Sequence, residues 1–140
     1  MIVNLQRKVK IDAGSFEPFV QKVLDSVDEA AGAEVAVAFV SDRRMKQLNK
    51  DFRGKQGTTD VLSFPQEPDE FAAEEDNFLG DIVISLEQAA KQAGENGLTL
   101  ENEIKQLILH GVLHLCGYDH EADNGEMNAR ELELREKLHI

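Results

Sequence analysis

Residues 110–120, His-Gly-Val-Leu-His-Leu-Cys-Gly-Tyr-Asp-His, decide what fold is expected around them. His110 and His114 are four residues apart in a helix-like run, and this spacing stacks both imidazoles on one helix face. Gly117 follows where that helix should end, because glycine readily adopts the left-handed conformation that reverses a chain. The reversal allows His120 to offer a third ring nitrogen. The stretch therefore predicts a metal-binding helix followed by a turn.

The spacing His-x3-His-x2-Gly-x2-His is the skeleton of the metzincin peptidases. Those enzymes carry a glutamate general base directly after the first histidine, whereas this chain has Gly111 there. Three neutral imidazoles around Zn²⁺ leave a fourth position open, and such a site lowers the pKa of bound water to about 7. The sequence therefore predicts one zinc ion in a three-histidine cage that lacks the peptidase base. The undiminished positive charge of such a site favours an anionic substrate.

Other interpretations of the histidines stay open. They could be packed side chains of a helix with an unrelated third histidine, or they could hold a structural zinc. A structural site is usually closed by a fourth ligand, often cysteine, and Cys116 is the nearest candidate. It lies two residues after His114, about 200° around the helix, so we expect it to point away and to be a small core residue. His139 is expected at the surface.

In the rest of the chain, patterns typical of strands alternate with patterns typical of helices. The predicted strands cover residues 2–7, 34–40, 61–64 and 82–84, and the predicted helices cover about 16–31, 42–53, a short segment after Ser85, 100–116 and 124–138. The expected helix-capping residues are Ser15, Ser41, Ser85, Thr99 and Asp123. This order favours a mostly parallel sheet covered by helices, and the two final helices in succession favour the α+β class. At 140 residues, we expect one domain, 1–140.

Charge is unevenly distributed along this acidic chain. Its 15 Lys and Arg residues against 27 Asp and Glu residues give a net charge of −12, which disfavours non-specific nucleic-acid binding by the body as a whole. Residues 43–55 nevertheless contain a local cluster of six cations: Arg43, Arg44, Lys46, Lys50, Arg53 and Lys55. Residues 66–78 form a long acidic loop.

Four of these cations, Arg43, Lys46, Lys50 and Arg53, fall within an arc of about 80° on the predicted helix 42–53. Met45, Leu48 and Phe52 are expected to form the opposite, apolar arc. A solvated helix face is the ordinary explanation of such a stripe. Arg53 differs from the others because it ends the helix, where its paired N–H donors suit a phosphate. Its alternative role is an ion pair with a local carboxylate such as Asp60.

The sequence contains no apolar run long enough to span a membrane and begins without signal-peptide architecture. Its single cysteine cannot form an internal disulfide, which fits a reducing compartment. We therefore expect a cytoplasmic protein.

Four segments together resemble the bacterial YbeY family of rRNA maturation factors. These segments are Asn49–Lys55 (NKDFRGK), Thr59–Pro65 (TDVLSFP), Gly80–Ser85 (GDIVIS) and the histidine stretch 110–120, and the trailing Met127 and Glu131 also fit. The resemblance spans about residues 40–135 in the expected order. It implies a small mixed sheet surrounded by helices, with the histidine helix central. The combined expectation is a mostly parallel, four-stranded mixed sheet, about five helices and a metzincin-like metal helix.

The resemblance implies a single-strand-specific metallo-endoribonuclease that matures the 3′ end of 16S rRNA and acts in ribosome quality control. It implies one Zn²⁺ on His110, His114 and His120, and a functional Arg53. The implied partners are single-stranded rRNA and the ribosome or its small subunit, with no membrane and no DNA.

On this hypothesis, Arg53 stabilises charge that develops on the phosphate. The other basic residues hold the RNA backbone, namely Arg43, Lys46, Lys50 and Lys55. Asp119, next to a predicted ligand, could orient a histidine from outside the metal shell.

Two positions depart from the family pattern, which usually has Asp and Pro where this chain has Gln56 and Thr58. Loss of the proline predicts a less rigid loop. Two other functions stay open on the sequence alone: a metallopeptidase on the metzincin-like histidines, and a non-catalytic ribosome-binding zinc protein.

Overall fold

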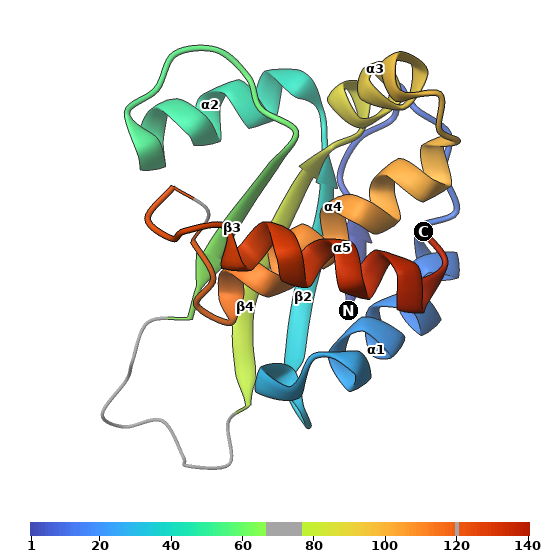
Figure 1. The fold of residues 1–140 in the computed structure, drawn as a ribbon. Coiled ribbons are helices and arrows are strands. Elements are labelled where there is room, and N and C mark those ends of the chain that lie inside the picture. Colours follow the sequence, from blue (N-terminus) through green and yellow to red (C-terminus); the bar gives the residue numbers. More distant parts are fainter. Residues whose placement is uncertain (67–76, 120) are drawn as a thin grey trace.

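The computed structural model describes residues 1–66, 77–119 and 121–140. Its strands are β1 (Ile2–Asn4), β2 (Glu34–Val40), β3 (Val61–Pro65) and β4 (Phe78–Ser85). Its α-helices are α1 (Glu17–Ser26), α2 (Asp42–Arg53), α3 (Leu86–Asn96), α4 (Leu100–Leu115) and α5 (Glu126–Leu138), and the 3₁₀ turns η1 (Ala13–Phe16) and η2 (Asp28–Ala30) flank α1. The α+β class and the expected numbers of strands and α-helices are confirmed for the described residues (Figure 1).

The four strands form one mixed sheet in the order β1-β2-β4-β3. β1 and β2 pair in parallel, as do β2 and β4, whereas β3 runs antiparallel to β4. The sheet is therefore mostly parallel, as expected. β4 lies between β2 and β3, so the end of β2 that leads into α2 is brought close to β3 and its preceding loop.

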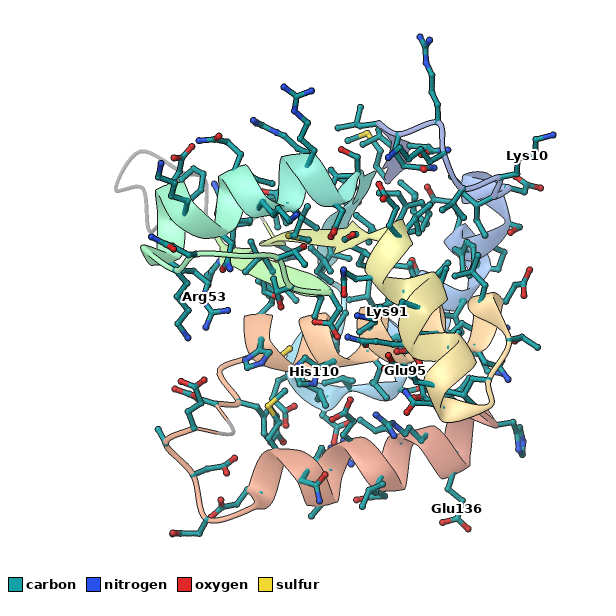
Figure 2. The ribbon with its side chains drawn as sticks, turned by 90° about the horizontal axis from the view of Figure 1, so that it is seen from above. Lys10, Arg53, Lys91, Glu95, His110 and Glu136 are labelled. Atoms are coloured by element: carbon teal, nitrogen blue, oxygen red, sulfur yellow. The ribbon has the colours of Figure 1, made fainter. Side chains whose placement is uncertain are left out.

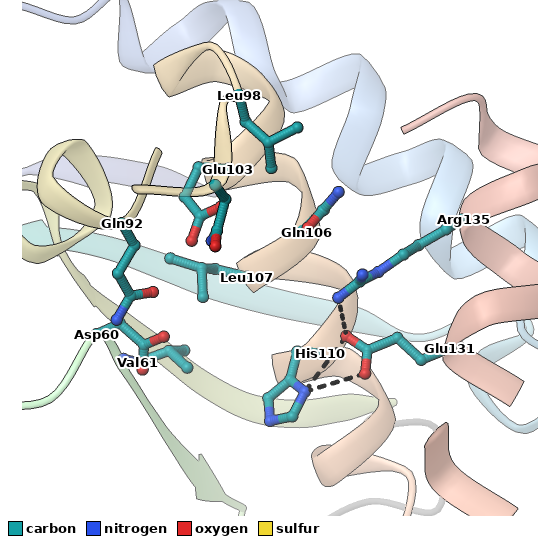
Figure 3. Close-up of a pocket in the computed structure, with 11 residues that line it drawn as sticks. Asp60, Val61, Gln92, Leu98, Glu103, Gln106, Leu107, His110, Glu131 and Arg135 are labelled. Atoms are coloured by element: carbon teal, nitrogen blue, oxygen red, sulfur yellow. Dashed lines mark hydrogen bonds and ion pairs between the residues drawn. The ribbon is translucent and has the colours of Figure 1, made fainter. Parts of the chain in front are cut away.

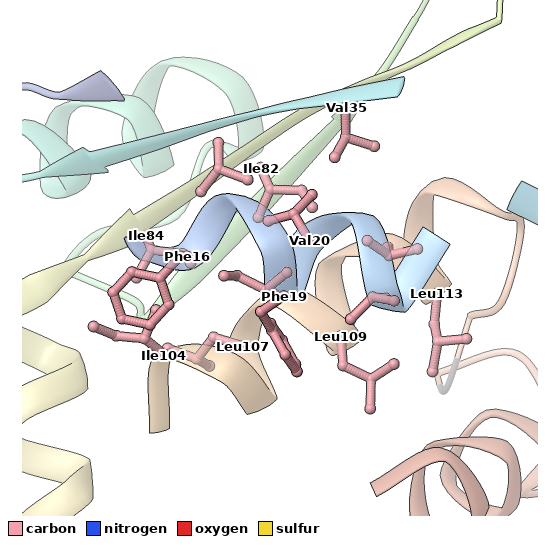
Figure 4. Packing of buried hydrophobic residues seen from close by; sticks show 14 of the residues in the cluster. Phe16, Phe19, Val20, Val35, Ile82, Ile84, Ile104, Leu107, Leu109 and Leu113 are labelled. Carbon is pink, nitrogen blue, oxygen red and sulfur yellow. The ribbon is translucent and has the colours of Figure 1, made fainter. Parts of the chain in front are cut away.

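Helices cover both faces of the sheet because side chains of a strand alternate between faces. Ile82 and Ile84 of β4 belong to the larger core, which α1 and α4 close on one face (Figure 4). Val83, between them, faces the other way and packs with Met45 of α2. α5 packs against α4 on the side away from the sheet (Figure 1). α4 is thus the central helix, with a layer on either side.

α4 carries the histidines and begins where its sequence predicts. The Thr99 hydroxyl accepts a hydrogen bond from the Asn102 N–H at 3.1 Å, which caps the helix. Gly111 faces Ile82 so closely that a Cβ on it would lie 2.8 Å from the Ile82 Cγ2. Helix and strand therefore approach so closely that any residue larger than glycine at position 111 would have to displace the Ile82 side chain. Gly117, at φ +99°, follows the helix in the expected left-handed conformation.

Several predicted boundaries differ from the structure. β1 stops at Asn4, because the Gln6 side chain exchanges hydrogen bonds with the backbone of Val9 and forms a turn instead. The predicted helix 16–31 is interrupted at Val27, whose extended ψ of 111° ends α1 before η2. Ser15 is not its N-cap, since its hydroxyl donates to the Asp12 carbonyl.

Phe52 is the clearest error in the predicted apolar faces, because it is 66% exposed. Met45 packs into the small core between α2 and the sheet, but Phe52 lies seven residues later, about 10 Å farther along the helix. There it contacts Phe64 edge to face, with ring centroids 5.2 Å apart. No helix in the described part of the chain has both the length and the apolarity to cross a membrane.

Candidate functional site

The two helical histidines lie together on one face of α4, as their spacing predicts. The Nε2 atoms of His110 and His114 are 3.0 Å apart, and the ring planes meet at 76°. Both side chains are only partly buried. The arrangement leaves two ring nitrogens converging at the surface of a largely buried helix.

The carboxylate of Glu131, on α5, contacts the Nδ1 atom of His110. The Nδ1 atom of His110 lies 3.3 Å from each carboxylate oxygen of Glu131, and Arg135 donates to the same carboxylate at 3.3 Å (Figure 3). Burial by itself raises the pKa of Glu131, but the hydrogen bond and charge of His110 and the guanidinium of Arg135 outweigh it, so the pKa is lowered. Glu131 is therefore an anion that orients the His110 ring through its Nδ1 atom, on the side away from His114.

The histidine pair fits a divalent metal ion such as zinc. A carboxylate that accepts the Nδ1–H of a neutral imidazole leaves the lone pair on Nε2, which for His110 is the atom that faces His114. Two nitrogens 3.0 Å apart can both lie about 2.0–2.1 Å from one Zn²⁺. Among the described residues no third His, Cys, Asp or Glu completes a metal-binding group. The predicted third ligand, His120, lies outside the described residues.

A pocket of about 550 Å³ brings Arg53 to the histidines. Arg53 comes from the end of α2, and His110 and His114 come from α4, so the pocket joins segments that are 57 residues apart (Figure 2). Its other polar walls are formed by Thr59, Asp60, Ser63, Tyr118, Asp119 and Glu121. One cation and two imidazoles therefore face a common space large enough for a phosphate and its sugar.

Hydrogen bonds hold the loop after Arg53 in place. α2 ends at Gly54, with φ +63°, and the Asn49 amide donates to the Gly57 carbonyl at 3.1 Å. The Thr58 hydroxyl donates to the Asp42 carboxylate at the start of the same helix. This contact restrains the loop at the position where the family pattern usually has proline. The Thr58 side chain thus restrains the loop through a contact that the comparison with the family pattern did not predict.

Asp42 is the centre of that anchor. Its carboxylate also accepts from the Ser85 hydroxyl at 3.1 Å and the Gln88 amide at 3.2 Å, both at the start of α3. Burial raises the pKa of Asp42, but these hydrogen bonds and the charge of Lys46 outweigh it and lower the pKa. One carboxylate therefore ties together α2, α3 and the loop beside the pocket.

The predicted basic residues are all exposed, but only Arg53 lines the pocket. None of Arg43, Lys46, Lys50, Arg53 and Lys55 forms an ion pair within 4 Å to another described residue. The alternative pairing of Arg53 with Asp60 is therefore not seen, although both line the pocket. The residues of the acidic loop from 67 to 76 lie outside the described part of the chain.

Asp119 lines the pocket, but its carboxylate accepts the Glu121 N–H at 3.0 Å. The carboxylate seen on a histidine is instead Glu131, which reasoning from spacing missed. Glu131 lies on a different helix, 21 residues from His110, so no local periodicity connects them. Its signal in the sequence was only its fit to the family pattern. The orienting role of Asp119 stays a prediction.

Cys116 and Gly111 bear on the alternative interpretations. Cys116 is partly buried and packs against the main core, and burial raises the pKa of its thiol to about 11, followed by the charge of Glu29. It behaves as the small core residue that was expected. Position 111, where a metzincin peptidase has its base, faces the sheet and Ile82. A longer side chain there would collide with the core before it could reach the pocket.

A sequence model of the family described as Endoribonuclease YbeY matches residues 1–139. The chain belongs to the YbeY family. The resemblance found in the sequence is thereby confirmed, and with it the coarse activity of an endoribonuclease acting on RNA.

Curated relatives agree over nearly the whole length. The endoribonuclease YbeY of Nautilia profundicola is 43% identical over 125 residues, which cover 89% of this chain and 86% of that protein. That of Pelotomaculum thermopropionicum is 41% identical and covers 100% of this chain and 97% of its own. A solution structure from Thermotoga maritima has a TM-score of 0.62 and 29% sequence identity, and the match covers 99% of this chain and 89% of that one.

Proposed function

We propose that this YbeY family member is a zinc-dependent endoribonuclease that cuts single-stranded rRNA, in maturation of the 16S rRNA 3′ end and in ribosome quality control. Its site of action would be the bacterial cytoplasm, on the ribosome or its small subunit, without membrane or DNA. Residues 1–140 would act as one domain. The observation that carries the proposal is the pocket in which Arg53 faces the converging nitrogens of His110 and His114.

His110, His114 and His120 would hold one zinc ion. When bound, the ion would supply a Lewis acid for a phosphoryl oxygen. Glu131 keeps the proton of His110 on Nδ1, so that Nε2 remains a donor atom toward the pocket. The carboxylate also keeps the ring from rotating, which preserves the 3.0 Å approach to His114.

Arg53 would bind the phosphate that is cleaved. Its guanidinium presents parallel N–H donors and stays charged at every physiological pH, so it can stabilise negative charge that grows in the transition state. The loop anchored by Asp42 and Thr58 begins directly after Arg53, and this anchoring restrains the backbone beside it. The exposed Arg43, Lys46, Lys50 and Lys55 would attract the RNA backbone, and Asp119 would support a histidine.

The deciding experiment measures cleavage of single-stranded RNA by purified protein in four variants. His114→Ala and Arg53→Ala should each lose at least about a hundredfold in rate, since each removes a group that acts in the transition state. The matched controls are His139→Ala, an exposed histidine outside the pocket, and Arg44→Ala, an exposed arginine elsewhere on α2. Equal activity in His114→Ala and His139→Ala would show that the cleavage does not depend on the histidine site and would refute the proposal.

The ribosomal role is tested in cells that depend on this chain for their YbeY family activity. The 3′ ends of 16S rRNA are mapped in cells that carry the wild type, His114→Ala or His139→Ala. We expect unprocessed 3′ ends with His114→Ala alone. A non-catalytic ribosome-binding protein would instead restore normal ends in all three strains.

A further inference from the structure

A second cavity of about 600 Å³ adjoins the histidine pocket on the other side of Asp60 and Val61. We call it the α3–α4 pocket, because side chains of α3 and α4 line much of it, and α5 closes one side (Figure 3). Both cavities share His110, Asp60 and Val61 in their walls. A ligand that enters one is therefore next to the other.

The distance between the α3–α4 pocket and the histidines suits a nucleotide whose phosphate lies at the histidines and whose base lies in the pocket. Glu103, Leu107 and His110 follow one face of α4. Glu103 and His110 are seven residues apart, which corresponds to about 10 Å along the helix axis. That is close to the span from a phosphate to the far edge of its own base, so the pocket is placed for a base next to the scissile phosphate.

The charge of this pocket disfavours a second phosphate. Among the described residues that line it, Arg135 is the cation, and its guanidinium already pairs with Glu131, which in turn contacts His110. The remaining charged groups in the described part of the wall are the carboxylates of Asp60 and Glu103. An anion would be repelled, whereas a neutral group rich in N–H donors would be attracted.

The two carboxylates are already arranged around an N–H donor. With its nitrogen directed toward them, the Gln92 amide donates to Asp60 Oδ2 and Glu103 Oε1, both at 3.0 Å. Glu103 is only 4% exposed, and burial followed by the charge of Asp60 raises its pKa despite a hydrogen bond from Asn96. A carboxylate has about four acceptor positions, so these two amides leave room for further donors on Glu103.

We propose that the α3–α4 pocket binds one base of the RNA substrate and prefers guanine, with Glu103 as the residue that determines this specificity. Guanine presents adjacent N1–H and N2–H donors, which one carboxylate accepts in parallel. Adenine and cytosine place a ring acceptor beside their amine, and uracil flanks its one N–H with carbonyls, so each would set an acceptor against the carboxylate. Val61, Leu98 and Leu107 supply apolar surface for the faces of the ring.

This inference rests on the proposed ribonuclease function, and its test separates the two. Single-stranded RNA with randomised positions is cleaved by the wild type, and the ends of the products are sequenced. We expect guanine to be enriched about tenfold at one position next to the cut, the size of one paired base contact. Cleavage that depends on His114 but shows no base preference would overturn the specificity pocket and leave the ribonuclease proposal standing.

Glu103→Gln keeps the shape of the side chain and should reduce the guanine enrichment to near one. Glu101→Gln is the matched control, because Glu101 is an exposed carboxylate on the same turn of α4. Equal enrichment in both variants would overturn the assignment of Glu103.

A binding measurement tests the base preference of the α3–α4 pocket independently of RNA cleavage. Guanosine and inosine, which lacks the N2 amine, are titrated into wild-type protein while backbone amide chemical shifts are followed by NMR. We expect shifts at residues of α3 and α4, with guanosine bound about tenfold more tightly than inosine. Equal affinities, or shifts confined to other elements, would refute the proposal even if a variant failed to fold.

Discussion

We expect the buried carboxylate of Glu131, which contacts the Nδ1 side of His110, to increase the affinity of the site for a metal ion. Glu131→Gln removes the negative charge, and Glu131→Ala removes both oxygens that lie 3.3 Å from the His110 Nδ1. Loss of a partner that orients a ligand histidine typically lowers metal affinity about 10–100-fold, or about 1.4–2.8 kcal/mol. Because 3.3 Å is at the long end for a charged hydrogen bond, we expect about tenfold for Gln and up to about a hundredfold for Ala.

The assay is competition for Zn²⁺ between the purified protein and a chelating dye of known affinity. Glu133→Gln is the matched control, because it removes the same charge from α5 at an exposed position, where Glu133 pairs with Arg130 at 3.1 Å. Urea unfolding of the metal-free proteins separates any loss of fold stability from loss of affinity. If the zinc affinities of Glu131→Gln and Glu133→Gln agree within about twofold, the reasoning about Glu131 is refuted.

Three further predictions concern the scaffold and the basic stripe. Gly80→Ala should destabilise the fold by about 3 kcal/mol in urea unfolding, because its Cβ would lie 2.2 Å from a β3 carbonyl oxygen at φ +145°; a change below 1 kcal/mol would contradict this. The lowered pKa of Asp42 means that its stabilising contribution is complete above the ordinary value of 3.8 and is lost as pH falls through the lower folded value. Asp42→Asn should therefore cost more stability at pH 6 than at pH 2.5, and an equal loss at both would exclude the carboxylate as the cause. Joint replacement of Lys46, Lys50 and Arg53 by Ala should make the fall of log RNA affinity with log salt shallower by about two units, and an unchanged slope would remove the stripe from RNA binding.

Much of this protein follows from local patterns in the sequence. Ser41, Ser85 and Thr99 cap the helices that they were expected to cap, because an N-cap needs only its own side chain and the next three residues. The convergence of His110 and His114 is equally local, since a spacing of four residues brings two side chains together in any α-helix. The left-handed conformation of Gly117 was also predicted locally, because glycine readily adopts a positive φ where a helix ends.

Tertiary structure alone decided which distant groups meet at those histidines. Arg53 lines the same pocket as the histidines because β4 lies between β2 and β3, and Glu131 contacts His110 because α5 packs on α4. Neither arrangement follows from a sequence period. The same holds for the exposure of Phe52, whose helix extends past the small core that buries its first turns. Helical periodicity determines which side chains share a face, but the order of strands and the packing of helices determine what that face meets.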